Sequence, residues 1–159
     1  MMRPMMRATW MSCLVALAAC GGGDDGGVQT TLFPAAYAAS YVKVRPCRPS
    51  ADHDLNNVTV LVDPDAVSAY MARDRPFPTG SVVVKAEYDF GDTDCTGPIT
   101  LWTVMVQLPA GSAPSTIDWH WQKIDANRDV TTDNEPRCIG CHTTCGGPPD
   151  GYAGTCSAP

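Results

Sequence analysis

The residues with the most definite chemistry lie in one segment near the end of the chain, Cys138-Ile139-Gly140-Cys141-His142. C-x-x-C-H is the spacing by which c-type haems are attached to proteins. Two thiols three residues apart can add to the two vinyl groups of one porphyrin, and the adjacent imidazole can then bind the iron. The segment therefore predicts a covalently attached haem c, with Cys138 and Cys141 as attachment points and His142 as an axial ligand of the iron.

Two other interpretations of this segment stay open on its residues alone. Cys145 could complete a Cys3His zinc site with Cys138, Cys141 and His142. The two cysteines could also be structural, beside a histidine with no role. The cellular compartment decides between these interpretations, so the start of the chain matters.

Residues 1–19 have the pattern of a secretory signal, with two arginines followed by a short apolar run. The run is too short for a membrane-spanning helix. Leu17-Ala18-Ala19-Cys20 resembles the lipobox of bacterial lipoproteins, which implies cleavage before Cys20 and lipidation of its sulfur. The alternative is an ordinary signal with an incidental cysteine. No aspartate directly follows Cys20, so we expect a lipoprotein on the periplasmic side of the outer membrane or at the cell surface.

The rest of the chain divides into a Gly-rich tether, residues 20–31, and one domain, residues 32–159. The signal contains two of the 11 basic residues and none of the 17 acidic ones, so the mature chain has 9 basic residues against 17 acidic, a formal net charge of −8. This charge argues against nucleic acid or an anionic lipid surface as a partner. We expect contact with the membrane only through the lipid anchor.

Four cysteines are left after the signal, the anchor and the haem motif are assigned: Cys47, Cys95, Cys145 and Cys156. In an exported protein they suggest two disulfides, with three possible connectivities. We favour Cys47–Cys95 and Cys145–Cys156, because the second pair closes a short loop rich in glycine and proline. The even number of remaining cysteines favours haem over zinc, since a zinc site that used Cys145 would leave one cysteine unpaired.

Hydrophobic patterning predicts an α+β, strand-rich fold: an antiparallel sheet of about four or five strands, one or two short helices, and a haem at the C-terminal end. The alternation over residues 81–88 would put Lys85 and Glu87 on the face opposite Val84. Asp125 to Asp129 reads as a hairpin-like turn, since it lacks the glycine and the glutamate of a calcium loop. The expected strands are residues 58–62, 81–88, 99–108 and 115–124, and residues 44–57 are expected to be a polar connection. The expected helices are residues 33–42 and 65–73. The second helix would have Val67, Tyr70 and Met71 on its inner face.

Several ordered stretches resemble the cytochrome P-460 family over roughly residues 32–152. The resemblance implies a β-rich fold and a haem held by two thioethers with His142 as axial ligand. The namesake members oxidise hydroxylamine, process nitric oxide and carry a bond from a lysine to the porphyrin, and Lys85 occupies that position. A sister group, the beta-type cytochromes c-prime, lacks this bond and binds nitric oxide or carbon monoxide. The matching stretches are Phe33-Pro34-x-x-Tyr37, Val60-x-Val62-Asp63-Pro64, Phe77-x-x-Gly80 to Tyr88, Leu101-Trp102-x-Val104-Met105, Asp118-Trp119-x-Trp121 and Cys138-x-x-Cys141-His142.

Three functions therefore compete: a haem oxidoreductase acting on hydroxylamine or nitric oxide, a gas-binding haem protein with a free Lys85, and an electron-transfer cytochrome. The first needs a carboxylate in the pocket, and the third needs a sixth ligand to the iron. Expected partners are a small nitrogen-oxide molecule, an unidentified redox protein and a second copy of the chain. In place of an arginine of the namesake enzymes, this chain has Val58. The candidate carboxylates are Glu87, Asp118, Asp133 and Asp150; the candidate sixth ligands are Met71, Met105, His53 and His120.

Overall fold

A computed structural model of the 159-residue chain describes residues 29–148 and 151–156. The expected signal, the candidate anchor Cys20, most of the tether and the candidate carboxylate Asp150 lie outside the described residues. Within these two ranges, no helix is both long enough and apolar enough to cross a membrane.

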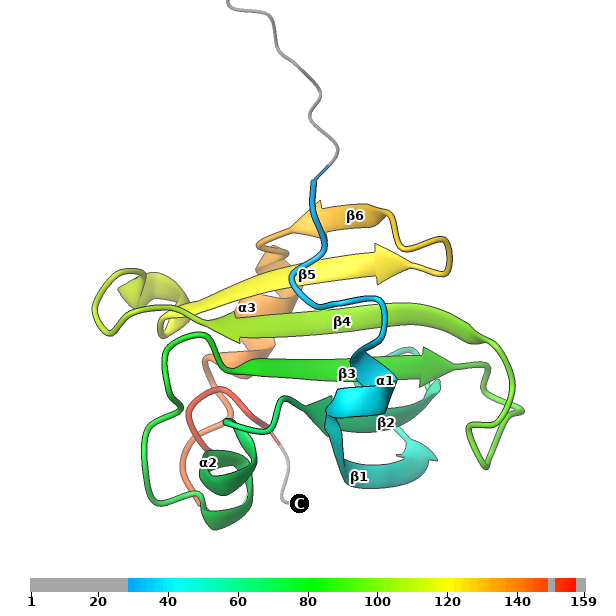
Figure 1. The fold of residues 1–159 in the computed structure, drawn as a ribbon, viewed down its shortest axis with the longest axis horizontal. Coiled ribbons are helices and arrows are strands. Elements are labelled where there is room, and N and C mark those ends of the chain that lie inside the picture. The colour runs from blue at the N-terminus through cyan, green and yellow to red at the C-terminus, as the bar shows by residue number, and fades with distance from the viewer. Residues whose placement is uncertain (1–28, 149–150, 157–159) are drawn as a thin grey trace, which may run out of the picture.

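The domain is built on one sheet of six antiparallel strands, each paired with its neighbour in chain order (Figure 1). Three short helices, α1 Tyr37–Ser40, α2 Val67–Ala72 and α3 Pro136–His142, accompany it. The α+β, antiparallel fold class is confirmed, with six strands instead of four or five and three helices instead of one or two. The strands are β1 Val42–Pro49, β2 Asn57–Val62, β3 Val82–Tyr88, β4 Ile99–Gln107, β5 Trp119–Asp125 and β6 Val130–Asp133.

Strand β1 lies where the sequence predicted a polar connection. It is the edge of the sheet, and its pairing with β2 is irregular on both sides of Arg45. Pro46 and Pro49 are tolerated there because an edge strand has a free side on which no N–H is needed. The two prolines, which suggested a loop, are therefore compatible with the strand.

Two other expected elements are shorter than predicted. The expected helix over residues 33–42 is reduced to α1. The strand expected from Ser115 begins only at Trp119, because Pro114–Thr116 forms a 3-10 turn and both Ile117 and Asp118 have a positive φ, 48° and 60°. Neither angle is compatible with an extended strand.

Helix α2 follows a turn held by Asp63, whose carboxylate accepts hydrogen bonds from the backbone N–H groups of Asp65 and Ala66 at 2.9 and 3.1 Å. It also accepts one from Val82 at the start of β3. Met71, which we expected on the inner face of this helix, is 50% exposed, whereas Tyr70 is buried. Val67 is partly buried, so the apolar stripe of α2 contains Val67 and Tyr70 but not Met71.

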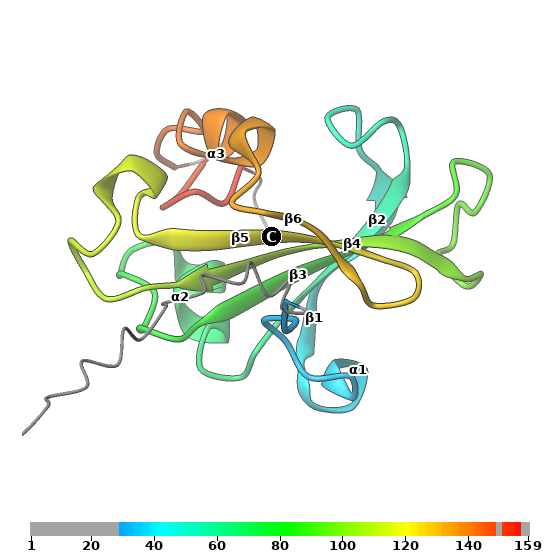
Figure 2. The same cartoon turned by 90° about the horizontal axis from the view of Figure 1, so that it is seen from above.

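The two faces of the sheet carry separate apolar clusters, and Figure 2 shows α3 and α1 on opposite sides. On β3, Val83 belongs to the cluster that packs against α2 and α3, and Val82 and Val84 to the cluster under α1. The predicted alternation of β3 is therefore confirmed. It places Lys85 and Glu87 on the same face as α3.

Candidate haem site

Helix α3 carries the C-x-x-C-H motif and is tied to the sheet at its start. Asn134 bonds to β5 through its backbone N–H, 2.7 Å from the carbonyl of Trp121, and through its side-chain oxygen, 3.2 Å from the N–H of Trp121. Pro136 then fits the first turn, where no backbone donor is needed. Cys138 and Ile139 pack on the apolar cluster of this face. The sheet therefore fixes where the motif lies.

A cavity of about 590 Å³ lies between α3 and this face of the sheet. Its volume is in the range of sites that hold small molecules and cofactors. Strands contribute apolar walls such as Val60, Val83 and Met105, while α3 contributes Cys138, Cys141 and His142. Lys85 and Glu87 also line it. The candidate attachment residues and the candidate crosslinking lysine thus share one cavity.

His142 is held in one orientation by its neighbours. Its Nδ1 lies 2.6 Å from the carbonyl oxygen of Gly154. Because a carbonyl can only accept, Nδ1 carries the proton and Nε2 keeps its lone pair. The ring of Trp121 lies 4.7 Å away, centroid to centroid. Burial lowers the pKa of His142 to about 4, so the imidazole is neutral at pH 7 and can bind a metal.

The cysteines of the described residues fall into two groups. Cys138 and Cys141 are free, and burial raises the pKa of the Cys138 thiol. Cys47 is bonded to Cys95, and Cys145 to Cys156, which is the pairing that the sequence favoured.

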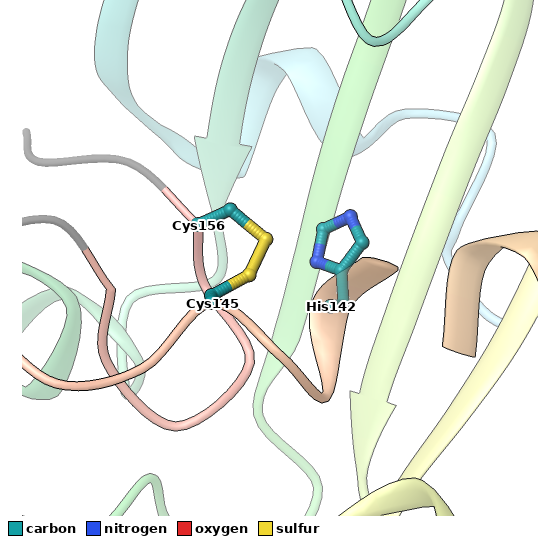
Figure 3. A group of neighbouring side chains, drawn as sticks. All are labelled: His142, Cys145 and Cys156. Carbon is teal, nitrogen blue, oxygen red and sulfur yellow. A yellow bond between two sulfur atoms is a disulfide. The ribbon is translucent and has the colours of Figure 1, made fainter. Parts of the chain in front are cut away.

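The second disulfide lies beside His142 (Figure 3). The ligand atoms of His142, Cys145 and Cys156 are within 4.8 Å of one another. Both sulfurs are, however, consumed in the disulfide and are not thiolates that could bind a metal. The zinc alternative therefore lacks the fourth ligand that it would take from Cys145.

Lys85 belongs to a polar cluster inside the cavity. Its Nζ contacts Nε2 of His53, and Nδ1 of the same imidazole lies 3.2 Å from Oε1 of Glu87. Glu87 is 2% exposed and also accepts a hydrogen bond from Thr103, 3.4 Å away. Burial, partly offset by the charge of Glu87, lowers the pKa of Lys85 to about 8. An amine of lowered pKa, a neighbouring base and a group that orients the base form an arrangement that activates nucleophiles.

His53 entered the sequence analysis only as a candidate iron ligand, and its place in this cluster was not predicted. It lies in the turn between β1 and β2, where its backbone N–H bonds to Ser50 at 3.2 Å. It is 32 residues from Lys85 in the chain. No local spacing links the two residues, because the contact depends on the pairing of β1, β2 and β3.

The remaining candidates separate into those that line the cavity and those that do not. Met105 and His53 line it, as does Glu87. Asp118 accepts backbone hydrogen bonds from Gly111 and Ala113 at 2.7 Å each, and so shapes its own loop. The other candidates with no place in the lining are His120 and Asp133, which pair at 2.8 Å, and Met71.

The residues of this cavity fit a covalent haem. Two free thiols and a neutral imidazole lie on one short helix at its wall. Trp121 and Arg48 also line the cavity, and Nε1 of Trp121 and Nε of Arg48 are buried with no hydrogen-bond partner. Unpartnered buried donors are rare in native proteins. The carboxylates of a haem would supply acceptors.

Fold and motif together define a strand-rich protein in which a short helix with a C-x-x-C-H motif lies on one face of an antiparallel sheet. Residues 34–147 match the family model for Cytochrome P460, which is most of the chain, and the chain therefore belongs to that family. In that family the haem is covalently bound. No curated protein matches the chain.

Proposed function

We propose that the protein is an exported, lipid-anchored c-type haem protein whose open iron site carries out redox chemistry on hydroxylamine or nitric oxide. The observation that carries the proposal is the single cavity lined by Cys138, Cys141, His142, Lys85 and Glu87. It unites an attachment motif, an axial ligand, a nucleophilic amine and a buried carboxylate. Membership of the Cytochrome P460 family supports the haem.

Each of these residues has a defined part in this proposal. Cys138 and Cys141 would hold a haem by two thioethers, and Nε2 of His142 would bind its iron. A bound haem would supply an iron centre that exchanges electrons and holds a small ligand. The apolar side chains of Val60 and Val83 keep water out of the cavity.

Lys85 is the proposed point of a third covalent bond to the porphyrin. An ammonium ion has no lone pair with which to attack a carbon atom, so the amine must first lose its proton. Replacing a C–H bond at the porphyrin edge by C–N then releases the ring hydrogen as a proton and two electrons, which a two-electron oxidant such as a peroxide would have to accept. With a pKa lowered to about 8, the amine is deprotonated far more often near neutral pH than an exposed lysine. His53, in contact with Nζ, is placed to accept the proton.

Oxidation of hydroxylamine releases protons, and the cavity needs a group to accept them. Glu87 is the candidate carboxylate, because it is buried at the cavity wall and bonded to His53. In this proposal, His53 and Glu87 carry protons away from the substrate.

A second candidate function is a gas-binding protein that does not turn over hydroxylamine. It is favoured by the contact between Lys85 and His53, which gives the amine a partner without any bond to the porphyrin. An electron-transfer cytochrome would instead use Met105 or His53, both at the cavity wall, as a sixth ligand.

The test uses protein matured with haem in an export compartment, with Lys85→Ala as the comparison. We expect the absorption spectrum of the reduced (ferrous) protein to differ from that of an ordinary c-type haem. The Lys85 peptide should retain the porphyrin in mass spectrometry. Hydroxylamine turnover should be lost in Lys85→Ala. An ordinary spectrum with an unmodified peptide would leave the gas-binding candidate. A pigment unchanged in Cys141→Ala or His142→Ala would refute haem attachment at the motif.

The protein is further proposed to be anchored by lipid at Cys20, on the periplasmic side of the outer membrane or at the cell surface. A redox protein would accept the electrons released from hydroxylamine. The net charge of −8, from 9 basic and 17 acidic residues in the mature chain, favours a basic docking surface on that partner. A homodimer through a sheet surface is part of the same proposal.

A further inference from the structure

The C-terminal tail returns to the haem motif and contacts its histidine. The backbone carbonyl of Gly154 lies 2.6 Å from Nδ1 of His142, twelve residues earlier in the chain. The disulfide Cys145–Cys156 closes a loop that contains Gly154. Figure 3 shows this disulfide next to the imidazole. We call the described residues of this loop, 145–148 and 151–156, the tail loop.

The described part of the tail loop is fixed around Gly154. Tyr152 and Thr155 exchange backbone hydrogen bonds of 2.9 and 2.8 Å, which form a tight turn. Nε1 of Trp119, a buried residue of β5, donates to the carbonyl of Ala153 at 2.8 Å. The turn is therefore held both by itself and by the sheet.

Gly154 is suited to this position because it has no side chain. Its φ is +84°, and a Cβ there would lie 2.8 Å from Cδ1 of Ile117. A rotation of the Ile117 side chain could relieve that contact, but the Cβ would also lie 3.3 Å from Nε1 of Trp119, the group that holds Ala153, and a φ of +84° is strained for any residue with a Cβ. The carbonyl that faces His142 therefore depends on a glycine in a left-handed conformation.

The hydrogen bond has a direct consequence for metal binding. It fixes the tautomer of His142 with Nε2 free, sets the plane of the ring and makes the imidazole a stronger donor to a metal. Helix α3 does not supply this contact, because its last turn ends at His142 itself. The partner comes from the tail loop.

We propose that the disulfide-closed tail loop is the positioning element of the axial histidine. The bond Cys145–Cys156 keeps the Gly154 carbonyl against Nδ1 of His142, and through it controls the strength of the bond between Nε2 and the iron. This inference rests on the proposed role of His142 as an iron ligand. It goes beyond that role, because it assigns a function to the second disulfide.

The experiment compares two haem-loaded double variants, Cys145→Ser with Cys156→Ser, and Cys47→Ser with Cys95→Ser. The second double variant is the matched control. It removes the other disulfide of the described chain, and neither Cys47 nor Cys95 lines the cavity. The readouts are the iron–histidine stretching band of the ferrous protein in resonance Raman spectra and the dissociation constant for carbon monoxide.

Opening the tail loop is expected to move the iron–histidine band to lower frequency and to change the dissociation constant by about 10-fold or more, as loss of a ligand's hydrogen-bond partner does at other metal sites. The control variant should keep the wild-type band. A wild-type band in the Cys145→Ser, Cys156→Ser variant would overturn the proposal. If the wild-type protein shows no iron–histidine band, the iron does not have histidine as its ligand in an open, five-coordinate site, and the proposed function itself fails.

A second pair of variants does not depend on removing a disulfide. Gly154→Ala leaves both disulfides in place but crowds Nε1 of Trp119, which holds the turn that presents the carbonyl. Gly80→Ala is its control, because Gly80 has a similar φ of +89° and open space where the Cβ would lie. The band should shift in Gly154→Ala alone. Equal bands in the two variants would contradict a role for the Gly154 carbonyl.

Discussion

A protonated, unbonded amine at Lys85 lowers the free energy of unfolding of the protein, because the side chain lies in a cavity away from water. Its pKa in the folded protein is about 8, against 10.5 in the unfolded chain. Between these values the unfolded state binds more protons, so stability rises with pH across this window. The difference of 2.5 pKa units corresponds to about 3 kcal/mol.

This linkage separates the two candidate functions. If Lys85 is free, the free energy of unfolding should rise by about 3 kcal/mol more between pH 8 and pH 10.5 than in Lys85→Met, as measured by guanidinium denaturation. If Lys85 is bonded to the porphyrin, the free energy of unfolding should change with pH in the same way in wild type and in Lys85→Met, since the amine no longer titrates in this range. Parallel curves in protein whose Lys85 peptide is unmodified would contradict the lowered pKa.

His53 provides a second test at the scale of a residue. His53→Gln removes the base that contacts Lys85 and bonds to Glu87, so both the fraction of bonded Lys85 and the rate of hydroxylamine turnover should fall, the latter by about 100-fold. Mass spectrometry and a turnover assay measure the two effects. The control is His120→Gln, because His120 pairs with Asp133 and does not line the cavity. Equal losses in both variants would remove His53 from the mechanism.

Among the elements, the regular strands were predictable and the irregular ones were not. The run around Lys85 alternates in a way that fixes which face each side chain occupies, and the structure agrees. Strand β1 contains two prolines and irregular pairing, so it has no such pattern. Its pairing with β2 brings His53 to Glu87, so the missed strand explains the missed residue.

The turn before α2 gives a prediction at this scale. Asp63→Ala removes an acceptor for the N–H groups of Asp65 and Ala66, and for that of Val82 at the start of β3. Loss of a side-chain acceptor for backbone N–H groups before a helix typically lowers the free energy of unfolding by about 1–2 kcal/mol. Urea denaturation should show this loss, while Asp65→Ala, which removes an exposed carboxylate with no bond of its own, should change stability by less than about 0.5 kcal/mol. Equal effects would show that the Asp63 carboxylate does not hold the turn.

For the whole molecule, the sequence indicated the haem motif, the preferred cysteine pairs and the strand-rich body, since each depends on local spacing or composition. The cavity depends on contacts between distant segments. Lys85, Glu87 and the motif share it because the two side chains lie on the face of the sheet that α3 covers. His142 contacts the carbonyl of Gly154 in a tail that Trp119 also holds, through Ala153. Such long-range contacts leave no signal in a single sequence.

The anchor at Cys20 is a prediction about the molecule in its cell. Cys20→Ser removes the sulfur that would carry the lipid, while the folded domain begins beyond the tether and contains every residue of the cavity. The variant should therefore move from the membrane fraction to the soluble exported fraction and keep its haem, since stable anchoring depends on the acyl chains. Cell fractionation followed by haem staining of the separated proteins measures both properties at once. If haem-stained Cys20→Ser protein stays with the membranes, some other part of the chain holds the domain there. Its acidic surface is poorly suited to that role, because anionic lipid repels it.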